Sequence, residues 1–288
     1  MDIYDAILIL EGGSMRGVFT AGVLDYLMEQ NIWIQKLIGV SAGSCNAIDY
    51  VSRQIGRSRD CMIIPDKKEQ YIHPLGMFSK KGLMDMEMLF DAYPNRLHPF
   101  DYATYQDSDI EMEVVMTNCL TGKAVYHRMK SIEGEDTMAL CKASCSMPVI
   151  CDPVVIDGVP YLDGGVGDSI PLAHAMEAYP DCKPIVILTR QADYRKEPDS
   201  KLTVKAMKRK LKDYPQLLNC LLDRPRVYNE EIEFVDSMEK EGKCFVMRPE
   251  LTPVGQMERD IDVLTAFYQH GHELMERDLK NLLEFLKN

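Results

Sequence analysis

The stretch Leu37-Ile38-Gly39-Val40-Ser41-Ala42-Gly43 decides how this chain folds. A short apolar run leads into the pattern Gly-x-Ser-x-Gly, and small residues follow it at once. In a nucleophile elbow a buried strand turns sharply into a helix, and the flanking glycines allow the tight backbone approach that exposes the serine hydroxyl. Gly39 and Gly43 occupy those positions, so we expect Ser41 at a strand–helix junction. The competing interpretation is a serine that only packs within a tight turn.

A second buried strand precedes this elbow. Residues 6–10 form a continuous apolar run, which is typical of a strand covered on both faces of a parallel sheet. Apolar residues then recur at helical spacing, at Val18, Ala21, Leu24 and Met28. Strand, helix, strand, helix predicts an α/β fold with right-handed crossovers. Because the carboxyl ends of two such strands lie side by side, we expect the loop after residue 10 to meet Ser41.

That loop, Glu11-Gly-Gly-Ser-Met-Arg-Gly17, is rich in glycine but matches neither common phosphate-binding pattern. A P-loop ends in Gly-Lys-Ser/Thr, whereas Val18 follows Gly17 here. A dinucleotide fingerprint requires G-x-G-x-x-G, and Ser14 stands at its third position. The remaining use is a group of backbone N–H donors beside the serine, which is an oxyanion hole.

The rest of the sequence predicts hairpins, short helices and a long helical end. We expect hairpins at residues 113–127 and 153–162, helices at 137–146 and 170–178, and strands at 184–189 and 244–247. Residues 53–109 contain four prolines and predict loops and short helices beside the core. The last helix is expected from about residue 256. We divide the chain into a core at residues 1–190 and a mostly helical region at residues 191–288.

A serine nucleophile needs a base, and the sequence offers two kinds. Asp163 precedes Gly164 and Gly165, although an acid before two glycines can also be an ordinary turn. His270 and His272 follow Asp163 in the order of an α/β-hydrolase triad. Those enzymes place several strands before the elbow, however, and here only one precedes it. The six histidines occupy no recognisable catalytic context, so we expect them to be structural.

At this point the sequence resembles the patatin-like phospholipases. Four blocks occur in that family's order and spacing, namely residues 11–17, 39–43, 143–148 and 163–165. The resemblance covers about residues 5–190 and implies a three-layer fold with a mainly parallel sheet flanked by helices. Two residues depart from the usual pattern. Ser14 stands where a third glycine is most common, and its Cβ restricts the loop, while Glu11 replaces an aspartate.

The resemblance also implies the roles of individual residues. Ser41 is the nucleophile and Asp163 the base of a dyad without histidine. The backbone of Gly12, Gly13 and Ser14 forms the oxyanion hole, Arg16 supports it, and the block at 143–148 packs against the site. The expected activity is hydrolysis of lipid acyl esters through an acyl-enzyme, without a cofactor. Two alternatives remain open: an acyltransferase or thioesterase with the same dyad, and a non-enzymatic regulatory protein that keeps the fold.

Composition limits the class of partner and the compartment. The net charge is −12, with 33 Lys and Arg against 45 Asp and Glu, which argues against a nucleic-acid partner. The longest stretch without a charged residue is 12 residues, at 37–48, whereas a membrane span needs about 20 apolar residues. Nine cysteines without ligand spacing predict a reducing, cytoplasmic location and no metal site. The N-terminus carries no signal-peptide pattern, and the oligomeric state stays open.

One segment departs from the acidic balance. Residues 190–213 contain nine Lys and Arg against four acids, a local charge of +5. Leu202, Val204, Met207 and Leu211 add a crude apolar stripe. A basic amphipathic helix can lie on an anionic membrane, so we expect either a peripheral lipid contact or a helix that covers the core with a solvated face. The 19 methionines likewise predict either an adaptable acyl pocket or plain core.

Overall fold

The apolar run at residues 6–10 lies in β1 (Asp2–Leu10), inside an eight-stranded mixed sheet. The structure is a computed structural model that describes residues 2–73, 76, 82–130 and 134–287. Strand order is β5-β6-β3-β2-β1-β7-β8, and β4 pairs with β3. The pairs β1–β2, β1–β7, β2–β3 and β7–β8 are parallel, whereas β3–β4, β3–β6 and β5–β6 are antiparallel. The predicted strand–helix–strand–helix unit is therefore confirmed.

The strands and helices have the following bounds. The remaining strands are β2 (Ile32–Val40), β3 (Glu111–Asn118), β4 (Ala124–Arg128), β5 (Val154–Ile156), β6 (Val159–Asp163), β7 (Lys183–Ile187) and β8 (Phe245–Met247). The α-helices are α1 (Gly17–Glu29), α2 (Ala42–Val51), α3 (Arg57–Met62), α4 (Tyr102–Asp107), α5 (Thr137–Cys145), α6 (Leu172–Ala178), α7 (Lys201–Lys210), α8 (Pro215–Lys240) and α9 (Ile261–Lys287). Short 3₁₀ turns η1 (Ser14–Arg16) and η4 (Gly164–Val166) follow β1 and β6, and a π-helical segment, η3 (Met88–Leu97), precedes α4.

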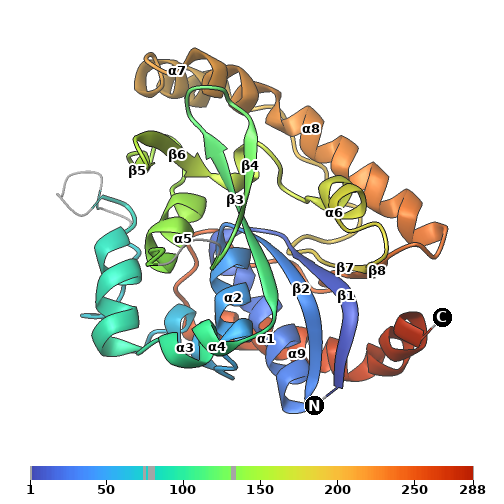
Figure 1. Cartoon of the computed structure of the whole chain (residues 1–288). Helices are drawn as coiled ribbons and strands as arrows, with labels where there is room; N and C mark the ends of the chain where they lie inside the picture. Colours follow the sequence, from blue (N-terminus) through green and yellow to red (C-terminus); the bar gives the residue numbers. More distant parts are fainter. Residues whose placement is uncertain (1, 74–75, 77–81, 131–133, 288) are drawn as a thin grey trace.

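Helices cover both faces of the sheet, which gives three layers (Figure 1). Along β1, Ala6, Leu8 and Leu10 belong to a core cluster shared with α1, α2 and α9, while Ile7 and Ile9 belong to a second cluster shared with α6 and α8. Alternate side chains of a strand point to opposite faces, so a strand buried on both sides must be apolar throughout. This is why the run has no polar interruption.

The two hairpins form where the turn residues predicted them. β5 and β6 meet at Asp157 and Gly158, whose φ angles of 50° and 78° suit a tight hairpin turn. β3 pairs with β2 through its first half and with β6 through residues 116–118. Asp163, at the end of β6, is thereby paired with Met116. The antiparallel edge therefore carries the predicted acid back toward the parallel strands.

The last helix begins five residues later than predicted. α9 starts at Ile261, and the Oδ1 atom of Asp260 accepts hydrogen bonds from the backbone N–H groups of Asp262 and Val263. Asp260 thus acts as the N-cap, a role that aspartate commonly takes. The chain before it is a loop, in which the carbonyl of Gln256 accepts a hydrogen bond from Met15 N at 3.4 Å. The segment around Gln256 is therefore a loop, and this hydrogen bond holds it against the glycine-rich segment.

The C-terminal segment contributes to the same core as the first strands. β8 adds to the sheet beside β7, and α9 lies against α1 (Figure 1). Two glycines allow this helix crossing. A Cβ on Gly22 would lie 2.1 Å from the Tyr268 carbonyl oxygen, and one on Gly271 would lie 2.2 Å from the Phe19 carbonyl oxygen. The two backbones therefore approach closer than any larger residue permits.

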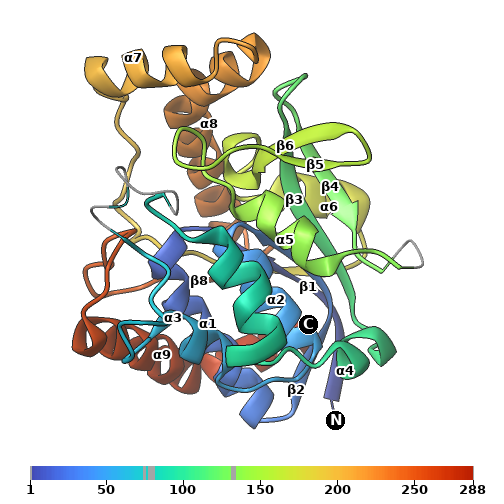
Figure 2. The same ribbon diagram turned by 90° about the vertical axis from the view of Figure 1, so that its left-hand side faces the viewer.

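The basic segment, residues 190–213, contains the irregular chain after β7 and helix α7, and α7 lies at the end of the molecule away from α9 (Figure 2). Met207 and Leu211 are buried in a third core cluster with Leu217 and Leu221, whereas Leu202 is 79% exposed. Part of the predicted stripe therefore covers the core and part of it faces solvent. Across the described residues, the structure contains no helix long and apolar enough to span a bilayer.

Candidate active site

Ser41 occupies the turn between β2 and α2, as the sequence predicts. Its φ of 52° and ψ of −125° are sparsely populated for a residue with a Cβ, and such conformations cost about 1–3 kcal/mol. The glycines at either side permit the turn. A Cβ on Gly43 would lie 2.3 Å from the Leu10 carbonyl oxygen, and one on Gly39 would lie 2.6 Å from Ser44 Cα. Gly39 and Gly43 are therefore packing requirements of the elbow.

Asp163 meets Ser41 directly. The Ser41 hydroxyl donates to Asp163 Oδ2 at 2.7 Å, and the backbone N–H of Gly165 donates to Oδ1 at 2.8 Å. Burial raises the pKa of Asp163, while the charge of Arg224 and these two hydrogen bonds partly offset that effect. Gly164 packs against the backbone of β3, because a Cβ there would lie 2.1 Å from the Val115 carbonyl oxygen. The Asp-Gly-Gly motif thus places one carboxylate with both oxygens engaged.

The block at residues 143–148 holds both residues in place. Ser144 Oγ accepts a hydrogen bond from Ser41 N at 2.9 Å and donates to the Val115 carbonyl at 2.7 Å. The carbonyl of Ser146 accepts from Asp163 N at 2.8 Å. Thr117 Oγ1 donates to the Asp163 carbonyl at 2.7 Å. The expected packing of this block is therefore found. Ser144 belongs to one of the four family blocks, whereas Thr117 lies outside all of them.

The glycine-rich loop lies against the serine. Leu10 is paired with Gly39 in the parallel register, and a Cβ on Gly12 would lie 2.8 Å from Ser41 Cβ. Among the residues that the structure describes, the backbone N–H groups of Gly12, Gly13 and Ser14 have no hydrogen-bond acceptor. All three residues are half-buried. Three free donors beside a serine hydroxyl are therefore available to a negatively charged oxygen.

Ser14 and Glu11, the two departures from the family pattern, are each accommodated. Ser14 adopts a φ of 53°, a left-handed conformation that glycine adopts freely and that costs other residues roughly 1–2 kcal/mol. Glu11 is buried, and its carboxylate accepts from Thr189 N at 2.6 Å, Thr189 Oγ1 at 3.0 Å and Tyr228 Oη at 2.9 Å. The longer side chain therefore reaches a tyrosine of α8.

Arg16 lies beside this loop rather than on the surface. It is 6% exposed, and its Nε atom lacks a hydrogen-bond partner in the described part of the chain. A Cβ on Gly13 would lie 3.3 Å from that atom. Burial, followed by the charge of Arg190, lowers the pKa of Arg16 to about 10, so the guanidinium stays charged at neutral pH.

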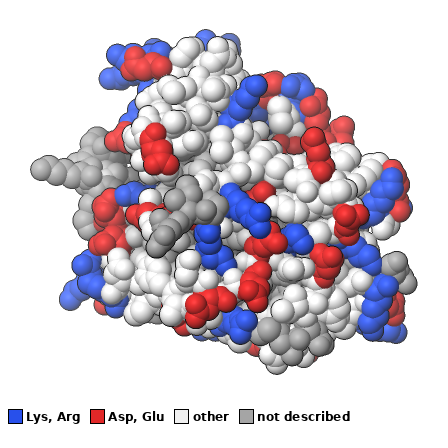
Figure 3. All heavy atoms as spheres, in the orientation of Figure 1, with Lys and Arg blue, Asp and Glu red and all other residues white. Residues whose placement is uncertain are grey.

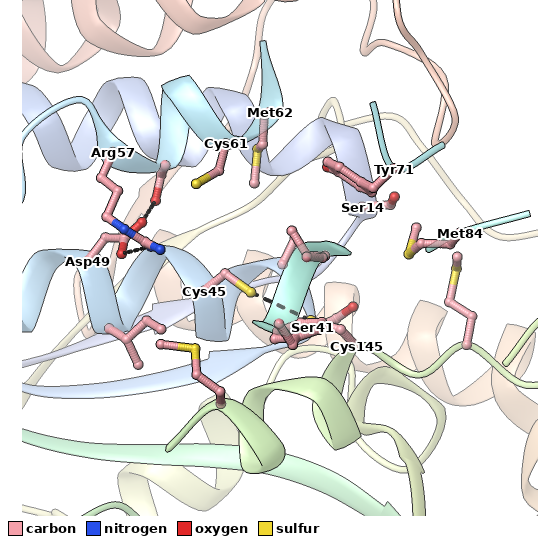
Figure 4. A pocket seen from close by; sticks show the side chains of 17 residues that line it. Ser14, Ser41, Cys45, Asp49, Arg57, Cys61, Met62, Tyr71, Met84 and Cys145 are labelled. Carbon is pink, nitrogen blue, oxygen red and sulfur yellow. Dashed lines mark hydrogen bonds and ion pairs between the residues drawn. The ribbon is translucent and has the colours of Figure 1, made fainter. Parts of the chain in front are cut away.

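Two cavities of different character meet at Ser41. A largely apolar one of about 70 Å³ runs from Ser41 and Ser14 toward Asp49 and Arg57 (Figure 4). Its other lining residues include four methionines and three cysteines: Met62, Met84, Met138, Met147, Cys45, Cys61 and Cys145. The second cavity, of about 840 Å³, is polar and contains Ser41 and Asp163 together with Gly12, Gly13, Ser14, Arg16 and Gly165. The serine therefore stands between an apolar and a polar space.

Histidines lie elsewhere in the described structure. The described lining of the two cavities contains none. His174 bonds to Glu113 at 2.7 Å and His272 to Glu29 at 2.8 Å, while His270 Nε2 accepts from Glu250 N at 2.9 Å. Among the described residues, no three His, Cys, Asp or Glu side chains are grouped so that they could hold a metal ion.

The fold and this site place the chain among the α/β proteins that carry a serine on a nucleophile elbow. The chain belongs to the patatin-like phospholipase family, whose model matches residues 8–176, more than half of its length. A second family model, described as a domain of unknown function (DUF6363), matches residues 214–287.

Individual relatives are distant. The uncharacterized protein YjjU of Escherichia coli K12 is 28% identical over 182 residues, which cover 58% of this chain and 47% of YjjU. Lysophospholipase nte1 of Aspergillus niger is 25% identical over 290 residues, covering 97% of this chain and 18% of nte1. The chain thus spans about half of the first relative and about a fifth of the second. The crystal structure of VipD from Legionella pneumophila shares the fold with a TM-score of 0.53 at 11% identity, over 96% of this chain and 67% of VipD.

Proposed function

We propose that this protein hydrolyses acyl esters of lipids, with Ser41 as nucleophile and Asp163 as base. The observation that carries the proposal is the 2.7 Å hydrogen bond from the Ser41 hydroxyl to a buried carboxylate, beside three unpaired backbone N–H groups. A nucleophile within hydrogen-bond reach of its base, next to donors for a developing oxyanion, is the arrangement that acyl transfer requires. Membership of the patatin-like phospholipase family and the lysophospholipase relatives support a lipid substrate.

The reaction follows from this geometry in two steps. Ser41 Oγ forms a bond to the ester carbonyl carbon while its proton passes to Asp163, and the carbonyl oxygen becomes an oxyanion facing Gly12, Gly13 and Ser14. The bond to the alcohol then breaks, and that alcohol takes the proton from Asp163. In the second step water attacks the acyl carbon and gives a proton to Asp163. The bond to Ser41 Oγ then breaks, Oγ takes that proton back from Asp163, and the fatty acid leaves. Oxyesters suit a carboxylate base because alcohols leave more easily than amines.

Each cavity suits a different portion of such a substrate. The apolar cavity accepts the acyl chain, and its methionines can move to fit chains of different shape. The polar cavity accepts the alcohol portion. Its volume of about 840 Å³ also leaves room for an acyl acceptor other than water, which favours acyl transfer as the second candidate function. Product analysis separates the two, because hydrolysis releases free acid and transfer yields a new ester.

Covalent labelling tests the proposed nucleophile. A fluorophosphonate reacts with an activated serine hydroxyl, so we expect one adduct per chain, located at Ser41 by peptide mass mapping. Heat-denatured protein is the control, because unfolding separates the hydroxyl from its base. An adduct on another serine, or none on the folded protein, contradicts the proposal.

We also propose a peripheral contact with anionic lipid through α7. Lys and Arg side chains project from the end of the molecule that α7 forms (Figure 3), and Leu202 is exposed among them. A basic surface helix gains about 1 kcal/mol per Lys or Arg near an anionic membrane. The quadruple variant Lys201→Gln, Lys205→Gln, Lys208→Gln, Arg209→Gln should lose at least tenfold of its binding to phosphatidylserine vesicles in a sedimentation assay. Equal binding by the variant and the unmodified protein would exclude this contact.

A further inference from the structure

The polar cavity beside Ser41 contains four basic side chains without a carboxylate partner. Within the described residues, Arg16, Arg190, Lys196 and Arg224 make no ion pair, although all four line the cavity. Lone cations at partly buried positions are uncommon, since burial of an unpaired charge is costly. The cluster therefore has no direct ion pair within the described chain, and the carboxylates of Glu11 and Asp163 offset its charge only in part.

The contacts that these side chains do make hold them in place without neutralising them. The Arg190 guanidinium lies over the Tyr194 ring at 4.1 Å, and Lys196 Nζ lies over the Tyr228 ring at 4.7 Å. Arg224 Nε donates to the carbonyl of Gly165. These contacts come from α8 and from the segment after β7, so the C-terminal part of the chain supplies three of the four cations.

The carboxylates nearby have other partners or face solvent. Glu11 accepts from Thr189 and Tyr228, and Asp163 accepts from Ser41 and Gly165 N. Three further acids line the cavity, namely Asp193, Glu197 and Asp199, and all three are exposed. Water and salt screen charges at such positions. Four basic side chains therefore face two buried carboxylates, Glu11 and Asp163, and the inner part of the cavity keeps a net positive charge.

Two further observations indicate that this positive space lacks an anion. Arg16 is 6% exposed, yet its Nε atom has no acceptor among the described residues. The pKa of Lys196 is lowered to about 7, first by burial and then by the charges of Arg224, Arg190 and Arg16, while Glu11 acts in the opposite direction. Both the unpaired donor and the mutual repulsion would be relieved by one bound anion.

We propose that Arg190, Lys196 and Arg224, with the buried Arg16, bind a phosphate on the alcohol portion of the substrate. The inference rests on the proposed function, because it takes Ser41 as the point where acyl and alcohol portions join. This basic cluster favours esters whose leaving alcohol carries a phosphomonoester over esters with a zwitterionic or neutral alcohol. Arginine suits this role, since its planar fork binds phosphate oxygens in pairs.

A purely electrostatic role at Asp163 is the competing explanation. Arg224 and Lys196 are the charges that lower the pKa of this carboxylate. Their loss would slow every substrate alike, whereas loss of a phosphate contact slows only phosphate-bearing substrates. Arg190 distinguishes the two roles best, because its charge acts on Lys196 and Arg16.

The test compares kcat/KM for three octanoyl esters kept below their micelle concentrations: those of glycerol 3-phosphate, glycerophosphocholine and glycerol. We expect the phosphate ester to be preferred at least tenfold, and Arg190→Gln and Lys196→Met each to lower that preference about tenfold. Arg195→Gln is the matched control, because Arg195 lines the same cavity but is exposed and paired with Asp236. Each preference is a ratio within one preparation, so a loss of folded protein cancels. Equal kcat/KM for the three esters overturns the proposal, as does a preference that both variants retain.

A binding experiment separates this inference from the proposed function. Calorimetry on Ser41→Ala compares 1-O-octylglycerol 3-phosphate with 1-O-octylglycerol, two ethers that cannot be hydrolysed. Tighter binding of the phosphate ether, weakened by adding Arg190→Gln, supports the subsite even if no ester is turned over. Inorganic phosphate is the third ligand. If it binds as tightly as the phosphate ether, the cluster is a site for free phosphate and the assignment to a substrate headgroup is overturned.

Discussion

Replacing Ser41 with alanine is expected to lower kcat for acyl-ester hydrolysis by about 10⁴-fold or more. Alanine removes the oxygen that forms the acyl-enzyme and leaves the donors of the glycine-rich loop in place. Any residual rate then comes from those donors acting on direct attack by water, a route that lacks an oriented nucleophile. Release of octanoic acid from the ester that proves most active gives the rate.

The elbow itself should survive this change. Alanine keeps the Cβ, so the backbone strain at φ 52° is not increased. Asp163 loses one hydrogen-bond donor, which costs roughly 1–3 kcal/mol of stability. The thermal unfolding temperature of the variant should therefore be measured together with its rate. Ser52→Ala is the matched control, because Ser52 is a buried serine just after the same helix, bonded to Asp49 and Gln54. A Ser41→Ala protein that keeps more than a hundredth of the rate would show that another group is the nucleophile.

Replacing Asp163 with asparagine is expected to lower kcat about 10³-fold or more. An amide oxygen can accept the Ser41 hydrogen bond but cannot take up the proton as attack proceeds. It also provides one acceptor oxygen where the carboxylate uses two, at 2.7 Å from Ser41 Oγ and 2.8 Å from Gly165 N. Asparagine therefore weakens orientation as well as removing the base. Steady-state kinetics on a small chromogenic ester measures the loss.

The pH profile of the unmodified protein distinguishes loss of a base from loss of structure. Burial raises the pKa of Asp163, so the protonated, inactive form should persist to a pH above that of an ordinary aspartate. Activity should accordingly fall as the pH drops through this raised pKa, and Asp163→Asn should lack that acidic limb. Asp168 lies five residues after Asp163, and its carboxylate accepts a hydrogen bond from Tyr126 Oη. The variant Asp168→Asn should therefore keep the acidic limb. Full activity of Asp163→Asn rules out the Ser–Asp dyad.

Local patterns explain how much of this site could be predicted. The elbow glycines, the unbroken apolar strand and the turn at Asp157 each depend on neighbours within a few residues, and the structure places all of them as expected. The later start of α9 is also a local effect, since Asp260 caps the helix through residues two and three positions after it.

Contacts between distant segments could not be predicted in the same way. Ser144 bonds to Ser41 across 103 positions, and Tyr228 bonds to Glu11 across 217. Nothing in the immediate sequence of a serine or a tyrosine specifies which remote group its hydroxyl will reach. The same holds for Arg224 and Lys196, whose basic surroundings predict a solvated face as readily as a cavity wall. These partners are decided by how the layers pack.

The pairing of α1 with α9 has a consequence for the order of events during synthesis. The ribosome produces residues 17–29 early, but the helix that covers them ends at residue 287. Phe19, whose ring centroid lies 5.5 Å from that of Phe267 in α9, lacks this part of its cover until α9 is made. Contacts between such distant segments close slowly, and apolar surface that waits for its partner is prone to aggregate. Completion of the α1 packing therefore depends on α9, a helix made long after α1 itself.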